Sequence, residues 1–202
     1  MWQVEVDPFC LKVLEKHWPE VKRYGNIRVL NTKELEPVDL ICGGFPCQPV
    51  SVAGKQRGRK DERWLWPEMA RIIGDLKPRW VLVENVPGLR TVNGGEAMAE
   101  VLSDLAQHRY DASWASIPAA ALGAPHLRYR VFIVAYATGQ PGNEGDIRKS
   151  IFTLGPAPLG GLCGGIGKAR WSAEPNVRRV VDGIPSRVGR LRALGNAVVP
   201  QV

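Results

Sequence analysis

The chain has 202 residues, of which 45% are hydrophobic and 23% charged, and its formal net charge is +7 at pH 7. This length and composition fit one globular domain with its own core. No apolar run approaches the ~20 residues of a membrane-spanning helix, and no signal-peptide pattern opens the chain, so we expect a cytoplasmic protein without a membrane partner. The cysteines match neither a zinc site nor a disulfide framework, so we expect reduced thiols and no metal. They are Cys10, Cys42, Cys47 and Cys163.

The first residues predict a strand followed by a helix. Residues 2–6 alternate between apolar and polar side chains, as in a short strand. Asp7 and Pro8 then suit the N-cap and first turn of a helix. Glu5 therefore lies near the carboxyl end of a strand, where acidic residues of dinucleotide-type folds bind ribose hydroxyls. From the residues alone, a solvated carboxylate on an edge strand is the simpler interpretation.

The rest of the chain is organised around residues 39–51, DLICGGFPCQPVS. The apolar run at 40–42 predicts a buried parallel strand. Two glycines follow, and we expect them to let the backbone turn sharply at the carboxyl end of the strand, where open α/β sheets bind ligands. Cys47 comes next, between a proline and a glutamine. By itself it is either a small buried hydrophobe or a nucleophile.

Two further strands carry polar residues at their ends. The apolar run at 80–83 leads directly into Glu84, and the run at 131–135 follows Arg128 and Arg130. A thiol, a carboxylate and two arginines at the ends of successive strands form a candidate catalytic group. Residues 51–65 predict a long loop of the kind that covers an active site.

Two amphipathic helices alternate with these strands. The first opens at Pro67, and residues 96–107 form the second. A further strand is expected at 114–117. The alternation predicts an α/β fold with a doubly wound, mostly parallel sheet and an antiparallel strand late in its order. The inward-facing residues are Met69, Ile72, Ile73 and Leu76 in the first helix and Met98, Val101, Leu102 and Leu105 in the second.

The alternation stops after residue 137. Residues 138–170 are rich in glycine and proline, which predicts loop or linker structure, and 171–192 are basic, with one more short helix expected before residue 195. Lys and Arg are densest at 55–63 and 178–192. We expect these two segments to contact the phosphates of a nucleic acid.

Four segments, GGFPCQPVS, ENVPGL, GAPHLRYRVFIVA and LGNAVVPQ, resemble in sequence and order the motifs of the DNA (cytosine-5) methyltransferases. The resemblance covers roughly residues 1–137 and 194–202. It implies a Rossmann-like, S-adenosylmethionine-dependent catalytic domain at 1–137, a short target-recognition region at 138–182 and a segment at 183–202 that returns to the catalytic domain.

The resemblance starts late relative to the family pattern. The strand and glycine-rich turn that hold the methionine end of the cofactor have no counterpart before Glu5, so it predicts a sheet incomplete at the N-terminus. It also predicts that residues 1–202 bind S-adenosylmethionine weakly and turn over little. Asn26 stands where the family usually has an acidic residue at the adenine.

The resemblance implies a role for each candidate residue. Cys47 would add to carbon 6 of a cytosine flipped out of the duplex, and Glu84 would hydrogen-bond its ring nitrogen 3 and exocyclic amine. Arg130 would hold the base, and Arg128 a phosphate or the active-site carboxylate. The implied cofactor contacts are Glu5, Val6, Asn26, Ile27, Gly44, Pro46, Leu65, Asn196, Ala197 and Val198. The implied DNA contacts are Gln48, Ser51, Lys55, Gln56, Arg57 and Arg59.

These roles predict a monomeric enzyme acting on double-stranded DNA, and the resemblance suggests a cognate restriction endonuclease as a second partner. Two alternatives stay open: an inactive remnant that only binds DNA, and a methyltransferase acting on cytosine in tRNA. A thiol redox protein is disfavoured, because no second cysteine completes a C-x-x-C pattern.

Overall fold

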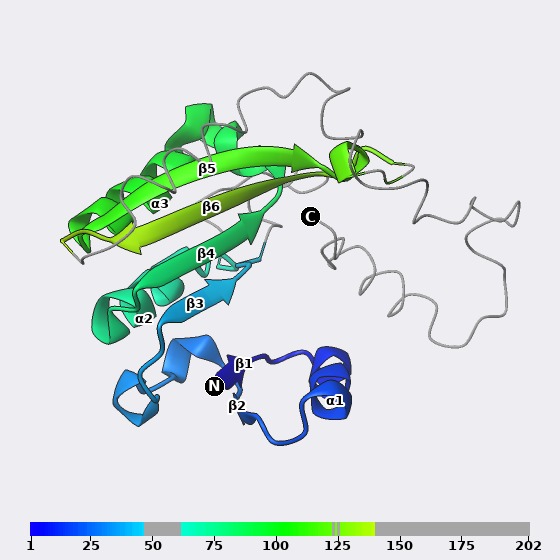
Figure 1. Ribbon diagram of the computed structural model, residues 1–202, viewed down its shortest axis with the longest axis vertical. Helices are drawn as coiled ribbons and strands as arrows, with labels where there is room; N and C mark the ends of the chain where they lie inside the picture. Colours follow the sequence, from blue (N-terminus) through cyan, green and yellow to red (C-terminus); the bar gives the residue numbers. More distant parts are fainter. Residues whose placement is uncertain (47–61, 123, 125, 140–202) are drawn as a thin grey trace, which may run out of the picture.

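A computed structural model describes residues 1–46, 62–122, 124 and 126–139. Its larger sheet has four strands, β3 (Leu40–Gly43), β4 (Trp80–Asn85), β6 (Tyr129–Ala137) and β5 (Tyr110–Pro118), in the order β3-β4-β6-β5 (Figure 1). β3 and β4 are parallel, whereas β6 is antiparallel to both of its neighbours. The predicted antiparallel strand late in the order is therefore β6. No helix in the described ranges could cross a membrane.

A second sheet is formed by the first residues of the chain. β1 (Trp2–Val4) pairs in parallel with β2 (Lys22–Tyr24), and α1 (Pro8–His17) connects them. In the described part of the chain, neither strand pairs with the four-stranded sheet, and Figure 1 shows both strands beyond its β3 edge. β1 ends earlier than the sequence predicted, and β2 was not predicted.

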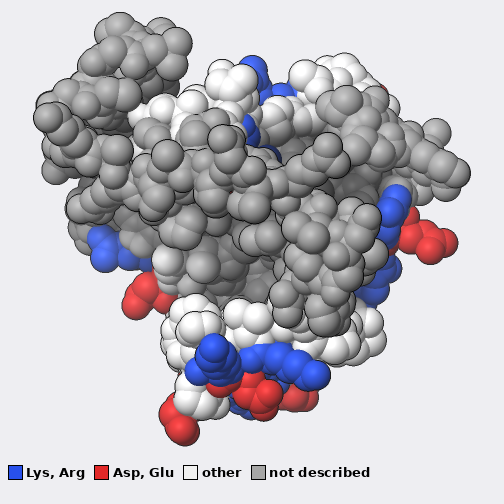
Figure 2. All heavy atoms as spheres, turned by 90° about the vertical axis from the view of Figure 1, so that its right-hand side faces the viewer, with Lys and Arg blue, Asp and Glu red and all other residues white. Residues whose placement is uncertain are grey.

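The start of α1 follows from its sequence. The side chain of Asp7 accepts hydrogen bonds from the backbone amides of Phe9, at 2.9 Å, and Cys10, at 3.2 Å, which confirms the N-cap. None of its residues is buried. Figure 2 shows side chains of both charge signs at the lower end of the molecule, where Figure 1 places this helix and its sheet. The described surface there therefore presents no field of a single sign.

The main core lies on one face of the four-stranded sheet. α2 (Trp66–Leu76) and α3 (Glu96–Gln107) pack there against alternate residues of β4 and β6, including Val81, Val83 and Ile133. Met69, Ile72, Ile73, Met98, Val101 and Leu105 are buried and Leu76 and Leu102 partly buried, so the predicted inward faces are confirmed. Short 3-10 helices complete the described fold: η1 (Ile27–Val29), η2 (Thr32–Glu34), η4 (Pro87–Arg90), η5 (Val92–Gly95) and η6 (Ala119–Leu122).

The prediction that β3 is buried was wrong for most of the strand. Leu40 is 49% exposed and Cys42 is also exposed, whereas Ile41 is buried. Successive side chains of a strand point to opposite faces, and α2 and α3 cover only the face of Ile41. The short run therefore forms a half-buried strand.

Candidate active site

The centre of the candidate site is an ion pair between the ends of two adjacent strands. β4 and β6 are antiparallel with Glu84 opposite Phe132, so Arg130, two residues from Phe132, lies on the same face as Glu84. Arg130 Nε lies 2.9 Å from Glu84 Oε1, and the two side chains are 15% and 22% exposed, respectively. The sequence prediction that strand ends bring these residues together is confirmed for this pair.

Burial and charge act in opposite directions on this carboxylate. Burial raises the pKa of Glu84 above its usual range, although the nearby Arg130 and Arg128 act to lower it. The pKa of Arg128 is lowered by burial and by the like charge of Arg130, while Glu84 counteracts both. Arg128 also has a φ of 32°, in the left-handed region that is uncommon for residues other than glycine. The site therefore holds two cations beside one partly desolvated carboxylate.

Gly44 lies directly against Glu84. A Cβ atom at position 44 would come 2.9 Å from Glu84 Oε2 and 3.2 Å from the Glu84 carbonyl oxygen. Neither Gly43 nor Gly44 has a positive φ, so the backbone conformation does not require glycine at either position. The expected sharp turn therefore does not explain the two glycines. Gly44 instead allows the segment after β3 to approach the carboxylate closely, and a side chain would push Glu84 aside.

A buried amide fixes the next residue of that segment. Asn85 is 1% exposed, and its side-chain nitrogen donates a hydrogen bond to the carbonyl oxygen of Phe45 at 3.2 Å. Its side-chain oxygen accepts a hydrogen bond from the Val86 amide at 2.9 Å. The Phe45 ring is buried against Trp64 and Trp66, with centroid separations of 5.0 and 5.6 Å. The backbone is therefore anchored two residues before Cys47.

A second group of candidate residues lies at the end of the small sheet. The Glu5 amide donates a hydrogen bond to the carbonyl oxygen of Tyr24 at 3.0 Å, so the segments following β1 and β2 leave the sheet side by side. One oxygen of the Glu5 carboxylate accepts from the amides of Val6 and Asp7, both at 2.7 Å. Asn26 caps η1 by accepting from the Arg28 amide at 3.0 Å. Glu5 and Val6 therefore leave the small sheet beside the segment that leads from Tyr24 to Asn26 and Ile27.

The chemistry of this second group fits the nucleoside part of S-adenosylmethionine. The Glu5 carboxylate is oriented by two backbone amides, and carboxylates in this position accept hydrogen bonds from ribose hydroxyls. Asn26 uses its oxygen for the cap, while its side-chain NH2 suits a purine ring nitrogen. Val6 is 70% exposed, and Ile27 is partly buried against the core. These two side chains give apolar surface beside the polar groups.

The remaining predicted site residues have different outcomes. Leu65 is the N-cap residue of α2 and is partly buried against the core, and Pro46 is partly buried directly after Phe45. Ten predicted residues lie outside the described ranges: Cys47, Gln48, Ser51, Lys55, Gln56, Arg57, Arg59, Asn196, Ala197 and Val198.

Two residues that support these groups were not predicted from the sequence. Asn85 carries a signal, since a polar amide in an otherwise apolar strand is costly unless it is hydrogen-bonded. Arg71 is the other, and its side chain donates to backbone carbonyls of the Asn26–Leu30 segment, far from it in sequence. Its position beside the apolar stripe of α2 gives no indication of those partners.

Curated relatives and a family model agree on what this chain resembles. The model described as C-5 cytosine-specific DNA methylase matches residues 1–158. The Type II methyltransferase M1.ScrFI of Lactococcus lactis subsp. cremoris is 33% identical over 156 residues, which are 77% of this chain and 38% of the relative. M.HhaI of Haemophilus parahaemolyticus is 32% identical over 133 residues, 65% of this chain and 40% of the relative. The chain thus spans about two fifths of these relatives.

Solved structures support the fold. The Entamoeba histolytica methyltransferase EhMeth matches 70% of this chain and 46% of its own, with a TM-score of 0.57 and 18% identity. Spodoptera frugiperda DNMT2 matches 71% of this chain and 45% of its own, with a TM-score of 0.55 and 22% identity. The predicted fold class, a Rossmann-like α/β methyltransferase sheet, is confirmed. The chain belongs to the C-5 cytosine-specific DNA methylase family.

Proposed function

We propose that this chain is the catalytic part of a DNA (cytosine-5) methyltransferase, which transfers a methyl group from S-adenosylmethionine to carbon 5 of a flipped-out cytosine. The observation that carries the proposal is the Glu84–Arg130 pair, packed against Gly44 three residues before Cys47. Family membership supports the same chemistry. The pair offers a carboxyl group and a guanidinium to one ligand, next to the segment that contains the thiol.

A thiol is needed because of the low reactivity of the target carbon. Carbon 5 of cytosine is a weak nucleophile, so Cys47 forms a bond to carbon 6 and the displaced π electrons make carbon 5 an enamine carbon. When bound, S-adenosylmethionine would supply an electrophilic methyl group: carbon 5 would bond to it while its bond to the sulfonium breaks, and S-adenosylhomocysteine would leave. After methylation, loss of the carbon 5 proton and departure of the thiolate restore the aromatic ring. The base must leave the stack for any of these atoms to be reached.

Glu84 assists the addition step. Negative charge develops on the ring as the thiolate adds, and a proton or hydrogen bond at nitrogen 3 stabilises it. Burial raises the pKa of Glu84, so its carboxyl group takes up a proton more readily than an exposed glutamate does and can then donate it to nitrogen 3. The other oxygen accepts from the exocyclic amine. These two contacts favour cytosine over thymine, which carries no exocyclic amine.

The arginines hold the charged groups in place. Arg130 orients Glu84 through the 2.9 Å contact and has further donors for the carbonyl oxygen of the base. Arg128 acts on Glu84 through its charge and suits an adjacent phosphate. A nearby cation lowers the pKa of a thiol, and we propose that these arginines increase the thiolate fraction of Cys47 in this way.

The cofactor and DNA contacts complete the proposal. Glu5, Val6, Asn26 and Ile27 would hold the nucleoside, with Gly44, Pro46, Leu65, Asn196, Ala197 and Val198 as further contacts. Gln48, Ser51, Lys55, Gln56, Arg57 and Arg59 would contact DNA. We propose a target-recognition region at 138–182 and a returning segment at 183–202. A restriction-modification role is supported by relatives that are named Type II methyltransferases.

Methyl transfer with labelled S-adenosylmethionine tests the proposal. In a complete version of the enzyme that contains residues 1–202, we expect transfer to duplex DNA but not to tRNA, and we expect Cys47→Ala to abolish it. The Cys47→Ala chain should still bind DNA, because phosphate contacts supply most of that affinity. Transfer to tRNA alone would establish the RNA alternative. DNA binding without any transfer by that complete version would establish the inactive remnant.

A further inference from the structure

The cofactor group and the catalytic group lie on different sheets. Glu5 and Asn26 follow β1 and β2, whereas Glu84 and Arg130 lie on β4 and β6, and no strand pairing joins the two sheets in the described part of the chain. Methyl transfer requires both groups to face one reaction centre within fractions of an ångström. Contacts other than strand pairing must therefore set their relative position.

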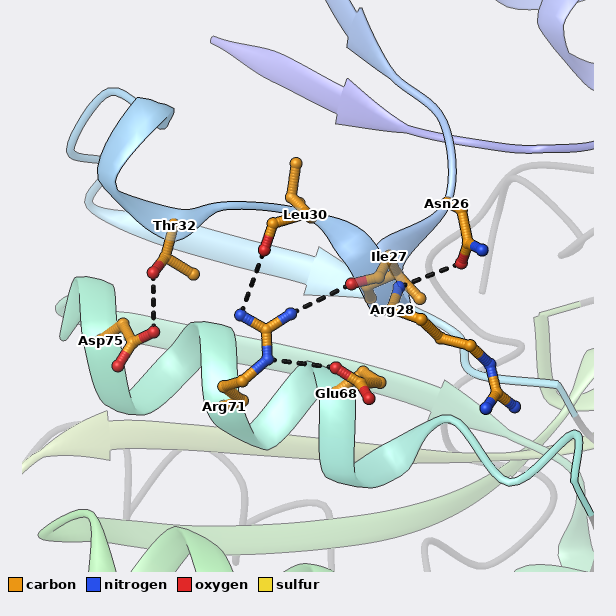
Figure 3. A network of polar contacts seen from close by, with 8 residues as sticks. All are labelled: Asn26, Ile27, Arg28, Leu30, Thr32, Glu68, Arg71 and Asp75. Atoms are coloured by element: carbon orange, nitrogen blue, oxygen red, sulfur yellow. Dashed lines mark hydrogen bonds and ion pairs between the residues drawn. The ribbon is translucent and has the colours of Figure 1, made fainter.

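One side chain makes two polar contacts across this junction. Arg71 on α2 donates from Nη2 to the carbonyl oxygen of Ile27 at 3.0 Å and from Nη1 to that of Leu30 at 3.2 Å (Figure 3). Its Nε pairs with Glu68 at 3.0 Å, which fixes the plane of the guanidinium. A planar fork can hold two carbonyl oxygens in a fixed arrangement, which a lysine ammonium cannot.

The turn held in this way is the one that carries Asn26. The Asn26 carbonyl accepts from the Val29 amide at 3.2 Å, and the Ile27 carbonyl accepts from the Leu30 amide at 3.4 Å as well as from Arg71. Arg28, in the same turn, donates to the backbone carbonyl of Glu62, the first described residue after positions 47–61. The turn is therefore bonded both to α2 and to the chain that returns from the Cys47 segment.

We infer that Arg71 is a positioning residue for the cofactor: it fixes the Asn26–Leu30 turn on α2, and so holds the nucleoside-binding residues in register with the catalytic sheet. This inference rests on the proposed function. Arg71 acts on the cofactor only through Asn26 and Ile27. Loss of Arg71 leaves the binding groups present but lets their turn move.

A neighbouring contact provides a matched control. The Thr32 hydroxyl donates to the Asp75 carboxylate at 2.7 Å and joins the same two segments, but away from Asn26 (Figure 3). Thr32→Val removes that bond with little change in shape. Arg71→Met and Thr32→Val both remove polar contacts between the first part of the chain and α2. Only Arg71→Met removes a hydrogen bond to the carbonyl of Ile27.

The test compares equilibrium binding of S-adenosylmethionine and of adenosine to the unaltered 202-residue chain and its variants. Arg71→Met should raise the dissociation constants of both ligands about tenfold, and Arg71→Lys should raise them by less. Thr32→Val should raise them by under about twofold. This order of affinities should hold even if the melting temperatures of the variants follow a different order. Hydrogen exchange at the amides of Arg28, Val29 and Leu30 should quicken in Arg71→Met. In the unaltered chain it should slow when ligand binds.

The outcomes separate the two proposals. Equal binding by the unaltered and Arg71→Met chains overturns the role of Arg71 alone. Equal weakening by Thr32→Val and Arg71→Met also overturns it, since a general loosening of the junction then explains the effect. If the unaltered chain binds neither ligand and shows no slowed exchange, the cofactor site of the proposed function is wrong, and the role of Arg71 with it.

Discussion

Replacing Arg130 with methionine removes the cation from the Glu84 pair and keeps a long apolar side chain in its place. Removing one partner of a fully buried ion pair costs about 3–5 kcal/mol, because the other charge is left desolvated. Here Glu84 is 22% exposed, and Arg128 also acts on its charge. We therefore expect Arg130→Met to lower the free energy of unfolding by about 1–3 kcal/mol at pH 7.

The loss should depend on pH in a defined direction. Burial already raises the pKa of Glu84 above the ordinary 4.5, and removal of Arg130 raises it further, since that cation acts to lower it. Between the unfolded and folded pKa values the folded chain binds more protons than the unfolded chain, so stability falls as pH rises through that interval. The penalty of Arg130→Met is thus largest at neutral pH and shrinks as pH falls towards 4.5.

Urea unfolding followed by tryptophan fluorescence measures this effect. The unaltered chain, Arg130→Met, Glu84→Gln and the double variant would be compared at pH 7 and at pH 5. The double variant should be more stable at pH 7 than the sum of the single losses predicts, because the buried charge that Arg130→Met leaves unpaired is no longer present. An Arg130→Met loss that is the same at both pH values, or grows towards pH 5, would refute the reasoning.

Three further predictions concern other parts of the site. Gly44→Ala should abolish methyl transfer because its Cβ would meet Glu84 at 2.9 Å, whereas Gly43→Ala, whose Cβ would lie 3.7 Å from Met69, should leave it largely intact; equal rates would contradict the close approach. Asn85→Ala should lower the free energy of unfolding by about 2–4 kcal/mol in urea titrations, because the Phe45 carbonyl and Val86 amide both lose a partner; a change under about 0.5 kcal/mol would contradict this. DNA affinity should fall with salt at a log–log slope near about −5 if ~6 phosphates are neutralised, and replacing Arg57, Arg59 and Lys60 should make the slope shallower; an unchanged slope argues against contacts from residues 55–63.

The three α-helices in the described ranges were predictable from the sequence to within a residue or two, whereas the short helix predicted before residue 195 lies outside those ranges. An apolar stripe at a spacing of three and four residues, with Pro67 or Asp7 at its start, is compatible with few structures other than an amphipathic helix. β4 and β6 were each predicted about two residues too short at the end that carries the charge, but an apolar run followed or preceded by a charge still places that charge near the rim of the sheet. Glu84 and Arg130 were found in this way.

The remaining features depend on contacts that leave no local pattern. β2 consists of Lys22, Arg23 and Tyr24, which carry no apolar alternation, and pairing with β1 alone makes it a strand. Gly44 has an ordinary backbone conformation, and only the carboxylate beside it shows why a side chain does not fit. Arg71 donates to backbone carbonyls 41 and 44 residues away in the sequence. A basic side chain on a helix can equally well extend into solvent, so its sequence position does not indicate these partners.

The central claim, that Cys47 forms a covalent bond to a cytosine in DNA beside Glu84, is tested most directly by trapping that bond. In duplex DNA that contains 5-fluorocytosine, carbon 5 of that base carries fluorine in place of hydrogen. Fluorine does not leave as hydrogen leaves in the form of a proton, so the thiolate is not expelled and a methylated adduct persists on the protein. The expected product is a complex that survives denaturation, requires S-adenosylmethionine, and maps by peptide mass spectrometry to Cys47. An adduct on Cys10, Cys42 or Cys163, or one that forms equally in Cys47→Ala, would contradict it.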